Sequence, residues 1–139
     1  MIEQSLFMVK PDGVSRGLIG EILSRVEKKG YKIRAMKMLS VDDELASRHY
    51  AEHRNKPFYD NLVAFITSGP SVAMLVEGDG VIMGLRELVG KTNPEDAAEG
   101  TIRRDFGASV ERNVVHASDS PASAEREIPL FFNETEIQS

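Results

Sequence analysis

The sequence predicts an α+β fold of the ferredoxin-like, split-βαβ type, in which helices cover one face of a four-stranded antiparallel sheet. Two observations favour this fold. Short apolar runs alternate with segments of helical periodicity, in the order β-α-β, helices, β-α-β and a last helix. Glycine, proline or a helix-capping residue marks most boundaries between these segments. We expect residues 1–139 to form a single domain.

Four strands are predicted from short apolar or alternating runs that end in turn residues. They cover residues 5–9, 31–39, 72–76 and 110–115. A turn at Lys10-Pro11-Asp12-Gly13 closes the first strand, and Gly78-Asp79-Gly80 closes the third. The fourth ends in the apolar pair Val114 and Val115, which indicates a strand that enters the core.

Five helices are predicted from apolar residues that recur every three or four positions. They cover residues 18–26, 42 to about 53, 58–66, 81–89 and 120 to about 127 or 132. Asp42 or Asp43 caps the second helix, and Ser120-Pro121 begins the last. The polar stretch 90–100 is expected to be a functional or mobile loop. Residues 102–106 fit neither pattern clearly.

Composition excludes several kinds of site. The chain has no cysteine, so it forms no disulfide, thiolate nucleophile or cysteine-ligated zinc site. Its net charge of -5 argues against non-specific binding to nucleic acid. No basic and apolar leader is visible at the start, and no apolar run approaches the roughly 18 residues of a membrane span. We therefore expect a cytoplasmic protein with no membrane partner.

The basic residues are not spread evenly, because seven of them lie near glycines or turn signals. They are Lys10, Arg16, Arg86, Lys91, Arg103, Arg104 and Arg112. In an acidic protein, cations beside loops favour a small anionic ligand. A solvated surface of mixed charge is the simpler explanation for any single one of them.

The stretch 113–120 concentrates chemically active side chains. It places an amide, an imidazole, a hydroxyl and a carboxylate in eight residues. Its valines predict the end of a buried strand, and Ser120-Pro121 predicts the start of a helix, so His116 lies near a positive helix end. That location suits chemistry on anions. A single histidine near a strand end is more often structural, so the assignment depends on other segments.

A second histidine pattern offers a different chemistry. His49 and His53 stand four residues apart with Glu52 between them, which matches the H-x-x-E-H pattern of some zinc hydrolases. A catalytic zinc of this kind needs a third protein ligand, and no downstream acidic helix supplies one clearly. A polar helix face is the simpler interpretation, and a zinc hydrolase is kept as a remote alternative.

Taken together, the motifs resemble those of the nucleoside diphosphate kinases. The stretch 113–120 is similar to that family's signature around its phosphorylated histidine. Further motifs occur in the family's order and span nearly the whole chain: Lys10-Pro-Asp-Gly-Val14 with Arg16-Gly17, Pro57-Phe58, Ser68-Gly-Pro70, Thr92-Asn-Pro94, Gly100-Thr-Ile-Arg103 and Asp105-Phe106. Two departures are Ala117, where the family often has glycine, and a C-terminus that stops early compared with longer members.

The resemblance implies transfer of the γ-phosphate of a nucleoside triphosphate to a nucleoside diphosphate. The transfer would follow a ping-pong mechanism through a phosphohistidine at His116. It further implies Mg²⁺ as the cofactor, held mainly by the nucleotide phosphates and not by the protein. Tolerance of any base, and of ribose as well as deoxyribose, is part of the same expectation.

The resemblance also assigns residue roles. His116 is the expected nucleophile, Glu127 would hold its tautomer, and Ser118 belongs to the same catalytic group. The expected ligands of the nucleotide are Arg86, Thr92 and Arg103 at the β- and γ-phosphates, Lys10 and Asn113 at the sugar and phosphates, the hydroxyl of Tyr50, and Phe58 and Val110 as an apolar clamp on the base. Lys10 and Tyr50 are counted with the catalytic residues as well.

The resemblance implies a homo-oligomer, for which we expect a dimer, with a tetramer as the alternative. Phe131 and Phe132 in the tail are apolar and are expected to seek a partner surface. Glu134 and Glu136 resist burial at a two-fold contact, and no cation beyond Arg126 follows to neutralise them.

A nucleic-acid-binding module is the main alternative outside the enzymes, because the ferredoxin-like sheet also serves RNA recognition. The chain has no run of strand aromatics of that kind, and its charge is acidic. The kinase interpretation is therefore preferred.

Overall fold

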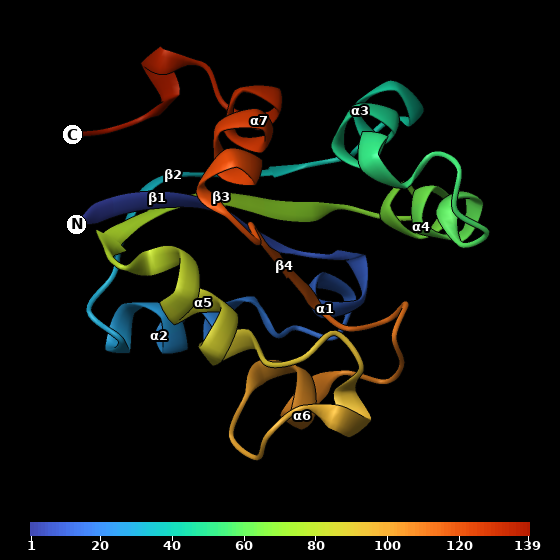
Figure 1. Cartoon of the computed structure of the whole chain (residues 1–139), viewed down its shortest axis with the longest axis horizontal. Coiled ribbons are helices and arrows are strands. Elements are labelled where there is room, and N and C mark those ends of the chain that lie inside the picture. Colours follow the sequence, from blue (N-terminus) through green and yellow to red (C-terminus); the bar gives the residue numbers. More distant parts are fainter.

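The computed structural model describes residues 1–139 as a four-stranded sheet between two groups of helices (Figure 1). The elements in chain order are β1 (Ile2–Val9), α1 (Pro11–Ser15), α2 (Ile19–Lys28), β2 (Lys32–Leu39), α3 (Asp43–His49), η1 (Ala51–His53), α4 (Tyr59–Ile66), β3 (Ser71–Asp79), α5 (Val81–Val89), η2 (Pro94–Asp96), α6 (Ile102–Phe106), β4 (Val115–Ala117), α7 (Pro121–Phe131) and η3 (Glu134–Glu136).

The sheet has the strand order β2-β3-β1-β4, and every neighbouring pair is antiparallel. The predicted α+β fold with a four-stranded antiparallel sheet is confirmed. β1 lies inside the sheet and pairs with β3 along its whole length, from Ile2 opposite Asp79 to Val9 opposite Val72. Its other neighbour, β4, contributes only three residues, and His116 lies opposite Met8.

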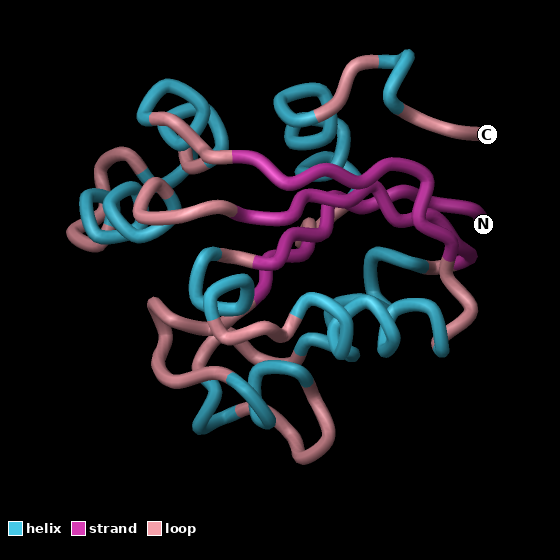
Figure 2. Tube along the Cα trace, turned by 180° about the vertical axis from the view of Figure 1, so that it is seen from behind, coloured by secondary structure: helices cyan, strands magenta, loops and turns pink.

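Helices cover both faces of the sheet, so the expectation of one covered face is wrong. α2 and α5 lie on one side of the strands, and α3, α4 and α7 lie on the other (Figures 1 and 2). The reason is visible in β1, where Leu6, Phe7, Met8 and Val9 are consecutive and fully buried. A strand that is apolar at every position needs cover on both faces. This arrangement also leaves no open sheet face of the kind on which an RNA-binding module stacks bases.

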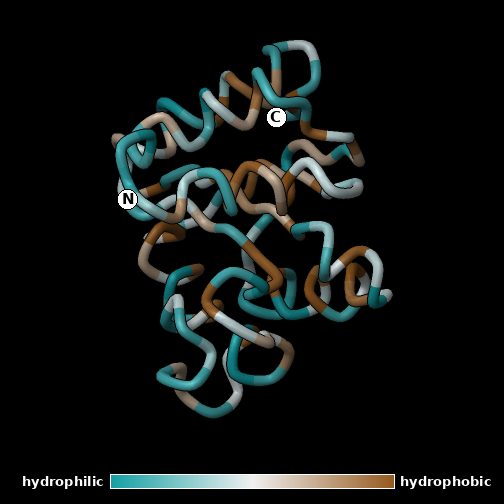
Figure 3. Tube along the Cα trace, turned by 90° about the vertical axis from the view of Figure 1, so that its right-hand side faces the viewer, coloured by the Kyte–Doolittle hydropathy of each residue, from teal (hydrophilic) through white to brown (hydrophobic).

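Each face of the sheet has its own apolar core. Phe7 and Val9 pack with residues of α2 and α5, whereas Leu6 and Met8 pack with residues of α3, α4 and α7. Figure 3 shows apolar segments running through the middle of the molecule, while hydrophilic segments dominate its periphery. None of the helices combines the length and the apolar character that a membrane crossing requires.

Several predicted elements need correction. The fourth strand covers Val115–Ala117 and not 110–115, because Val114 adopts a positive φ of 75° that breaks an extended strand. The expected turn at 10–13 belongs instead to the short helix α1. The helix predicted over 42–53 ends at His49 and continues as the separate 3-10 turn η1. Residues 102–106, left unassigned, form α6.

The C-terminal tail packs against its own chain. Phe131 and Phe132 are buried in the core of the α7 face, so they do not await a partner. Glu136 pairs with Lys37 of β2 at 3.2 Å, which supplies the neutralising cation that the sequence did not reveal. The tail carboxylates therefore give no argument against a larger assembly, apart from the exposed Glu134.

Candidate active site

A cavity of about 430 Å³ collects nine of the eleven predicted site residues. The nine are Lys10, Tyr50, Phe58, Arg86, Thr92, Arg103, Val110, Asn113 and His116. They come from the end of β1, from α5, α6 and β4, and from the segments between them. The other two, Ser118 and Glu127, lie behind His116, away from the cavity lining.

His116 is held from behind by a short chain of hydrogen bonds. Its Nε2 lies 3.1 Å from Oε1 of Glu127, which places a carboxylate acceptor on that ring nitrogen. Ser118 donates its hydroxyl to the same Oε1 at 2.7 Å, and the backbone N–H of Leu6 donates to the Ser118 hydroxyl at 3.0 Å. The carboxylate fixes the tautomer with hydrogen on Nε2 and leaves Nδ1 with a free lone pair.

Glu127 is buried on α7 yet stays ionised. Burial raises its pKa, but the hydrogen bonds from His116 and Ser118, with the charge of Arg126, outweigh burial and hold the net pKa below its usual value. Arg126 Nη2 lies 3.6 Å from the second oxygen of Glu127. The site therefore has a fixed negative charge directly behind the imidazole.

Two aromatic side chains from the end of α3 wall the imidazole. Burial, with the charge of Glu127, raises the pKa of the Tyr50 hydroxyl to about 12, so this group stays a donor. His49 is 4 % exposed, and its ring packs edge-on against His116 with centroids 4.6 Å apart. Burial and the neighbouring charge of His116 lower the pKa of His49 well below its usual value.

Two buried cations face the cavity. Burial, with the charge of Arg103, lowers the pKa of Lys10 to about 8. Burial, with the charge of Arg86, lowers the pKa of Arg103 to about 10. Arg103 donates to the carbonyls of Gly90 at 3.2 Å and Val115 at 2.8 Å, so its guanidinium is fixed. Neither Lys10 nor Arg103 forms a salt bridge within the chain, and crowded cations of this kind are poised for a polyanionic ligand.

Asn113 braces the cavity from one side. Its Nδ2 donates to the carbonyls of Thr92 at 3.1 Å and Val110 at 2.9 Å, and its Oδ1 accepts from Lys10 Nζ at 3.0 Å. Both N–H donors are used within the chain. A ligand hydroxyl is therefore met through Oδ1 or through Lys10.

The turn into β4 depends on a residue far away in sequence. The N–H of Val114 donates to Asp12 Oδ2 at 3.1 Å, and its carbonyl accepts the Lys10 backbone N–H at 2.8 Å. These bonds hold Val114 at its positive φ, a conformation that costs a β-branched residue of the order of 1–3 kcal/mol. The strained turn directs the following strand, and hence His116, towards the cavity.

The mouth of the cavity has apolar walls. Phe58 is 41 % exposed and Val110 is 50 % exposed, although both are apolar. Because they line the same cavity on different segments, a flat ligand ring would cover both. Neither residue is part of the chain's own core clusters.

Five further residues line the cavity without having been assigned to the site from the sequence: His53, Leu62, Glu111, Ala117 and Asp119. Asp119 accepts a hydrogen bond from the Ser123 hydroxyl at 2.6 Å, and this bond holds the pKa of the Asp119 carboxyl below its usual value. The helix N-cap is Ser120. Arg104 is exposed and does not line the cavity.

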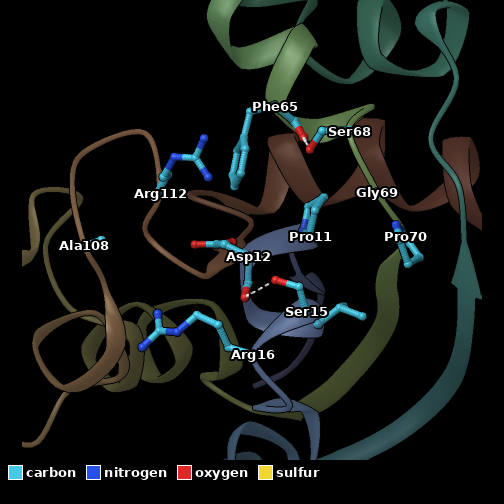
Figure 4. A pocket seen from close by; sticks show the side chains of 11 residues that line it. Pro11, Asp12, Ser15, Arg16, Phe65, Ser68, Gly69, Pro70, Ala108 and Arg112 are labelled. Atoms are coloured by element: carbon cyan, nitrogen blue, oxygen red, sulfur yellow. Dashed lines mark hydrogen bonds between the residues drawn. The ribbon is translucent and has the colours of Figure 1, made fainter.

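A second cavity of about 450 Å³ is lined by α1 and by the segment after α4, and it contains none of the predicted site residues. Figure 4 shows Arg16, Arg112 and Asp12 around it, with Phe65 standing beside Arg112. It lacks a histidine, so it has no nucleophile of the kind that the first cavity offers.

The alternative zinc pair is not assembled. His53 lies beyond the end of α3, and its Nδ1 lies 3.1 Å from Lys56 Nζ. The side-chain cluster that contains His49 includes His116 and Glu127 instead. The break between α3 and η1 is the physical reason, because the one-turn spacing holds only in a continuous helix.

Comparisons with known proteins agree with this geometry. The family model described as nucleoside diphosphate kinase matches residues 3–137. The chain is 64% identical to the nucleoside diphosphate kinase of Archaeoglobus fulgidus, over 98% of this chain and 90% of that protein. It is 59% identical to the one of Moorella thermoacetica, over 98% of both chains.

Solved structures agree as well. The nucleoside diphosphate kinase of Aquifex aeolicus superposes with a TM-score of 0.97 at 42% identity, covering 99% of each chain. The one of Halobacterium salinarum, solved in complex with CDP, gives a TM-score of 0.97 at 50% identity over 100% of this chain and 93% of that one. The chain therefore belongs to the nucleoside diphosphate kinase family, and its activity is phosphate transfer between nucleotides.

Proposed function

We propose that the transfer runs by a ping-pong mechanism in which His116 Nδ1 carries the phosphate. Nδ1 attacks the γ-phosphorus of a nucleoside triphosphate, the bond from phosphorus to the β-γ bridging oxygen breaks, and the nucleoside diphosphate leaves with that oxygen. A terminal oxygen of a second diphosphate then attacks the phosphorus and releases His116. The observation that carries this proposal is the Nε2 contact with Glu127, which leaves Nδ1 as the free nucleophile.

Glu127 and Ser118 act through His116 in this proposal. As Nδ1 forms its bond to phosphorus, positive charge develops on the imidazole, and the ionised Glu127 stabilises it. Ser118 holds the carboxylate in place. Lys10, Arg86 and Arg103, with the hydroxyls of Thr92 and Tyr50, stabilise the charge on the transferring phosphoryl oxygens.

We propose that Mg²⁺ accompanies the nucleotide and is held mainly by its phosphates. Magnesium requires oxygen ligands, and the cavity lining contains only two carboxylates, Glu111 and Asp119, among three cations. This donor set fits an ion brought in on phosphate and not a protein cage. Asp119 is the carboxylate whose lowered pKa keeps it charged. When bound, the ion neutralises charge on the phosphate oxygens.

Substrate tolerance follows from the walls of the cavity. Phe58 and Val110 offer flat apolar contacts, and stacking does not read the hydrogen-bond pattern of a base. We therefore propose that any common base is accepted. The sugar side offers only Lys10 and Asn113 Oδ1, which supports use of both ribose and deoxyribose nucleotides.

We propose that the chain forms a homodimer. β2 is an edge strand, and its Met36 and Met38 side chains are 53 % and 59 % exposed. β2 also carries Lys32, Arg34 and Lys37, but exposed methionines on an edge strand favour contact with a second copy. A tetramer is the alternative assembly. We also keep two predictions from the sequence, namely that residues 1–139 form a single domain and that the protein is cytoplasmic.

The proposal is tested with ATP labelled at the γ-phosphate. Wild-type protein, freed of nucleotide, should retain label that is labile to acid and stable to alkali, and peptide mapping should place it at residue 116. His116→Ala should retain none and lose turnover while keeping its circular dichroism spectrum, whereas His53→Ala should still take label. Turnover in His116→Ala, or label at His49 or His53, would contradict the assignment.

A further inference from the structure

The polar side chain of His49 has no role in the proposed reaction. It is 4 % exposed, and neither of its ring nitrogens has a hydrogen-bond partner. A buried polar group without a partner costs free energy, of the order of 1–3 kcal/mol. Its packing against Phe131, with centroids 5.4 Å apart, and Tyr50 would suit an apolar ring equally well. The two imidazole nitrogens are therefore available to bind a ligand.

The unpartnered nitrogens lie beside two further donor atoms. One nitrogen each of His49 and His116 and one oxygen of Glu127 all lie within 4.8 Å of one another. Within this group, Nε2 of His116 and Oε1 of Glu127 are 3.1 Å apart. Tetrahedral zinc with bonds of about 2.0–2.1 Å spaces its ligands by roughly 3.4 Å. The donor atom of His49 lies within 4.8 Å of the other two, so metal binding would draw it closer by up to about 1.4 Å.

We propose that His49, His116 and Glu127 form an inhibitory site for a divalent transition-metal ion of the zinc class. Two imidazoles and a carboxylate are the protein ligands of many zinc sites, with water in the fourth position. Binding replaces the Nε2 proton of His116, which is released to solvent, so the bond to Glu127 becomes a shared bond to the metal. A cation on Nε2 then draws electron density from Nδ1 and weakens it as a nucleophile.

Selectivity follows from the donor set. Imidazole suits zinc, copper, nickel and cobalt, whereas magnesium prefers oxygen and keeps its waters. The ion that accompanies nucleotides would therefore not occupy this site. Metal binding rests on the three side chains alone, whereas inhibition rests in addition on His116 as the proposed nucleophile.

The chain has only three histidines, so metal binding can be observed directly in the wild-type protein. Apoprotein is titrated with ZnCl₂ while the imidazole resonances are followed by NMR. His49 and His116 should shift together, with one ion per chain, and His53 should stay unchanged. Co²⁺ in the same site should give the visible absorption of a four-coordinate ion. A shift of His53 alone, or no shift of His49, would overturn the proposal.

Matched variants test the inhibition. His49→Phe keeps the aromatic packing and removes the ligand, and His53→Asn is the control at the other non-nucleophilic histidine. His49→Phe should bind Zn²⁺ at least about tenfold more weakly, since even outer-shell changes cost 10–100-fold, and its inhibition is measured against its own turnover without zinc. Zn²⁺ should inhibit wild type and His53→Asn alike and His49→Phe far less. Equal inhibition of all three would overturn the proposal.

The two proposals fail in different ways. Label on His116 is measured without zinc, so its absence contradicts the phosphohistidine and leaves the NMR result standing. If label is found and His49 does not respond to Zn²⁺, the metal site alone is wrong. If His49→Phe does not fold, the wild-type titration still decides the metal site.

Discussion

Glu127 Oε1 lies 3.1 Å from His116 Nε2, and the carboxylate that makes this contact is 4 % exposed. The two residues stand on different elements, the last helix and the shortest strand. Because the carboxylate is ionised and buried, it favours one tautomer and one orientation of the ring before any substrate arrives.

Removing this carboxylate should slow phosphorylation of His116 more than it weakens nucleotide binding. Glu127→Gln is expected to lower the rate of phosphoenzyme formation by about 10- to 100-fold, the value of a charged hydrogen bond of about 1.5–3 kcal/mol. Rapid-quench measurement with labelled ATP checks this. Ser118→Ala removes only the support of the carboxylate and should cost less. A larger loss in Ser118→Ala than in Glu127→Gln would contradict the arrangement.

Nucleotide affinity should weaken as the pH rises through about 8. Burial lowers the pKa of Lys10 to about 8, so the ammonium that attracts phosphate is lost above that pH. At pH 9 about a tenth of Lys10 remains charged, and the affinity for a diphosphate should fall by up to about tenfold relative to pH 7. Calorimetric titration at several pH values checks this.

Lys10→Gln should bind weakly at every pH and lose this slope, whereas Lys91→Gln, at an exposed lysine outside the cavity lining, should keep it. The lowered pKa of Lys10 also affects folding stability, and here a rise in pH is favourable, whereas it weakens nucleotide binding. Between pH 8 and 10.5 the unfolded chain binds more protons than the folded one, so the free energy of unfolding should rise with pH across that window. A binding slope that survives in Lys10→Gln would exclude Lys10 as its source.

The base clamp predicts low selectivity. GDP, CDP, UDP and TDP should all be phosphorylated. The activation free energies that correspond to their kcat/KM values should lie within about 1–3 kcal/mol of each other, the scale of one stacking contact. Phe58→Ala should raise KM for all four by about tenfold or more. Phe65→Ala, on the same helix but facing the second cavity beside Arg112, is the control and should change KM little. Strict preference for one base in the wild type would rule the clamp out.

The proposed dimer can be broken at the edge of the sheet. Met38→Lys replaces an exposed apolar side chain of β2 with a further charge and should raise the dimer dissociation constant by at least about tenfold, since edge lysines oppose strand pairing. Met83→Lys changes an equally exposed methionine on α5 and should leave assembly unchanged. Sedimentation velocity over a concentration series distinguishes them. A wild-type monomer at all concentrations would end the proposal.

The sequence predicted those parts of the fold that local patterns determine. The helix over 81–89 matches α5 residue for residue, because its apolar spacing and flanking glycines agree. Val114 shows the limit: two adjacent valines indicate a strand, whereas hydrogen bonds to residues about a hundred positions earlier impose a positive φ. Such tertiary constraints leave no trace in the local sequence.

The candidate site was predictable for a different reason. His116 and its neighbours occur in a motif that resembles a family signature, and the cavity brings nine of the predicted residues together. His49 was interpreted as part of a polar helix face, yet it is buried against His116. Its burial depends on where α7 packs, which the periodicity of a short helix does not encode.

The strand order has a consequence for synthesis on the ribosome. β1 emerges first, but its partners in the sheet are the third strand and the last. The N–H of Leu6 donates to the hydroxyl of Ser118, which is synthesised 112 residues later. Until β4 and α7 have left the exit tunnel, one side of β1 is an unpaired strand that is apolar on both faces. Such strands aggregate. A nascent chain halted after Gly100 would be both inactive and in need of a chaperone, so errors late in translation should be the most damaging to this protein.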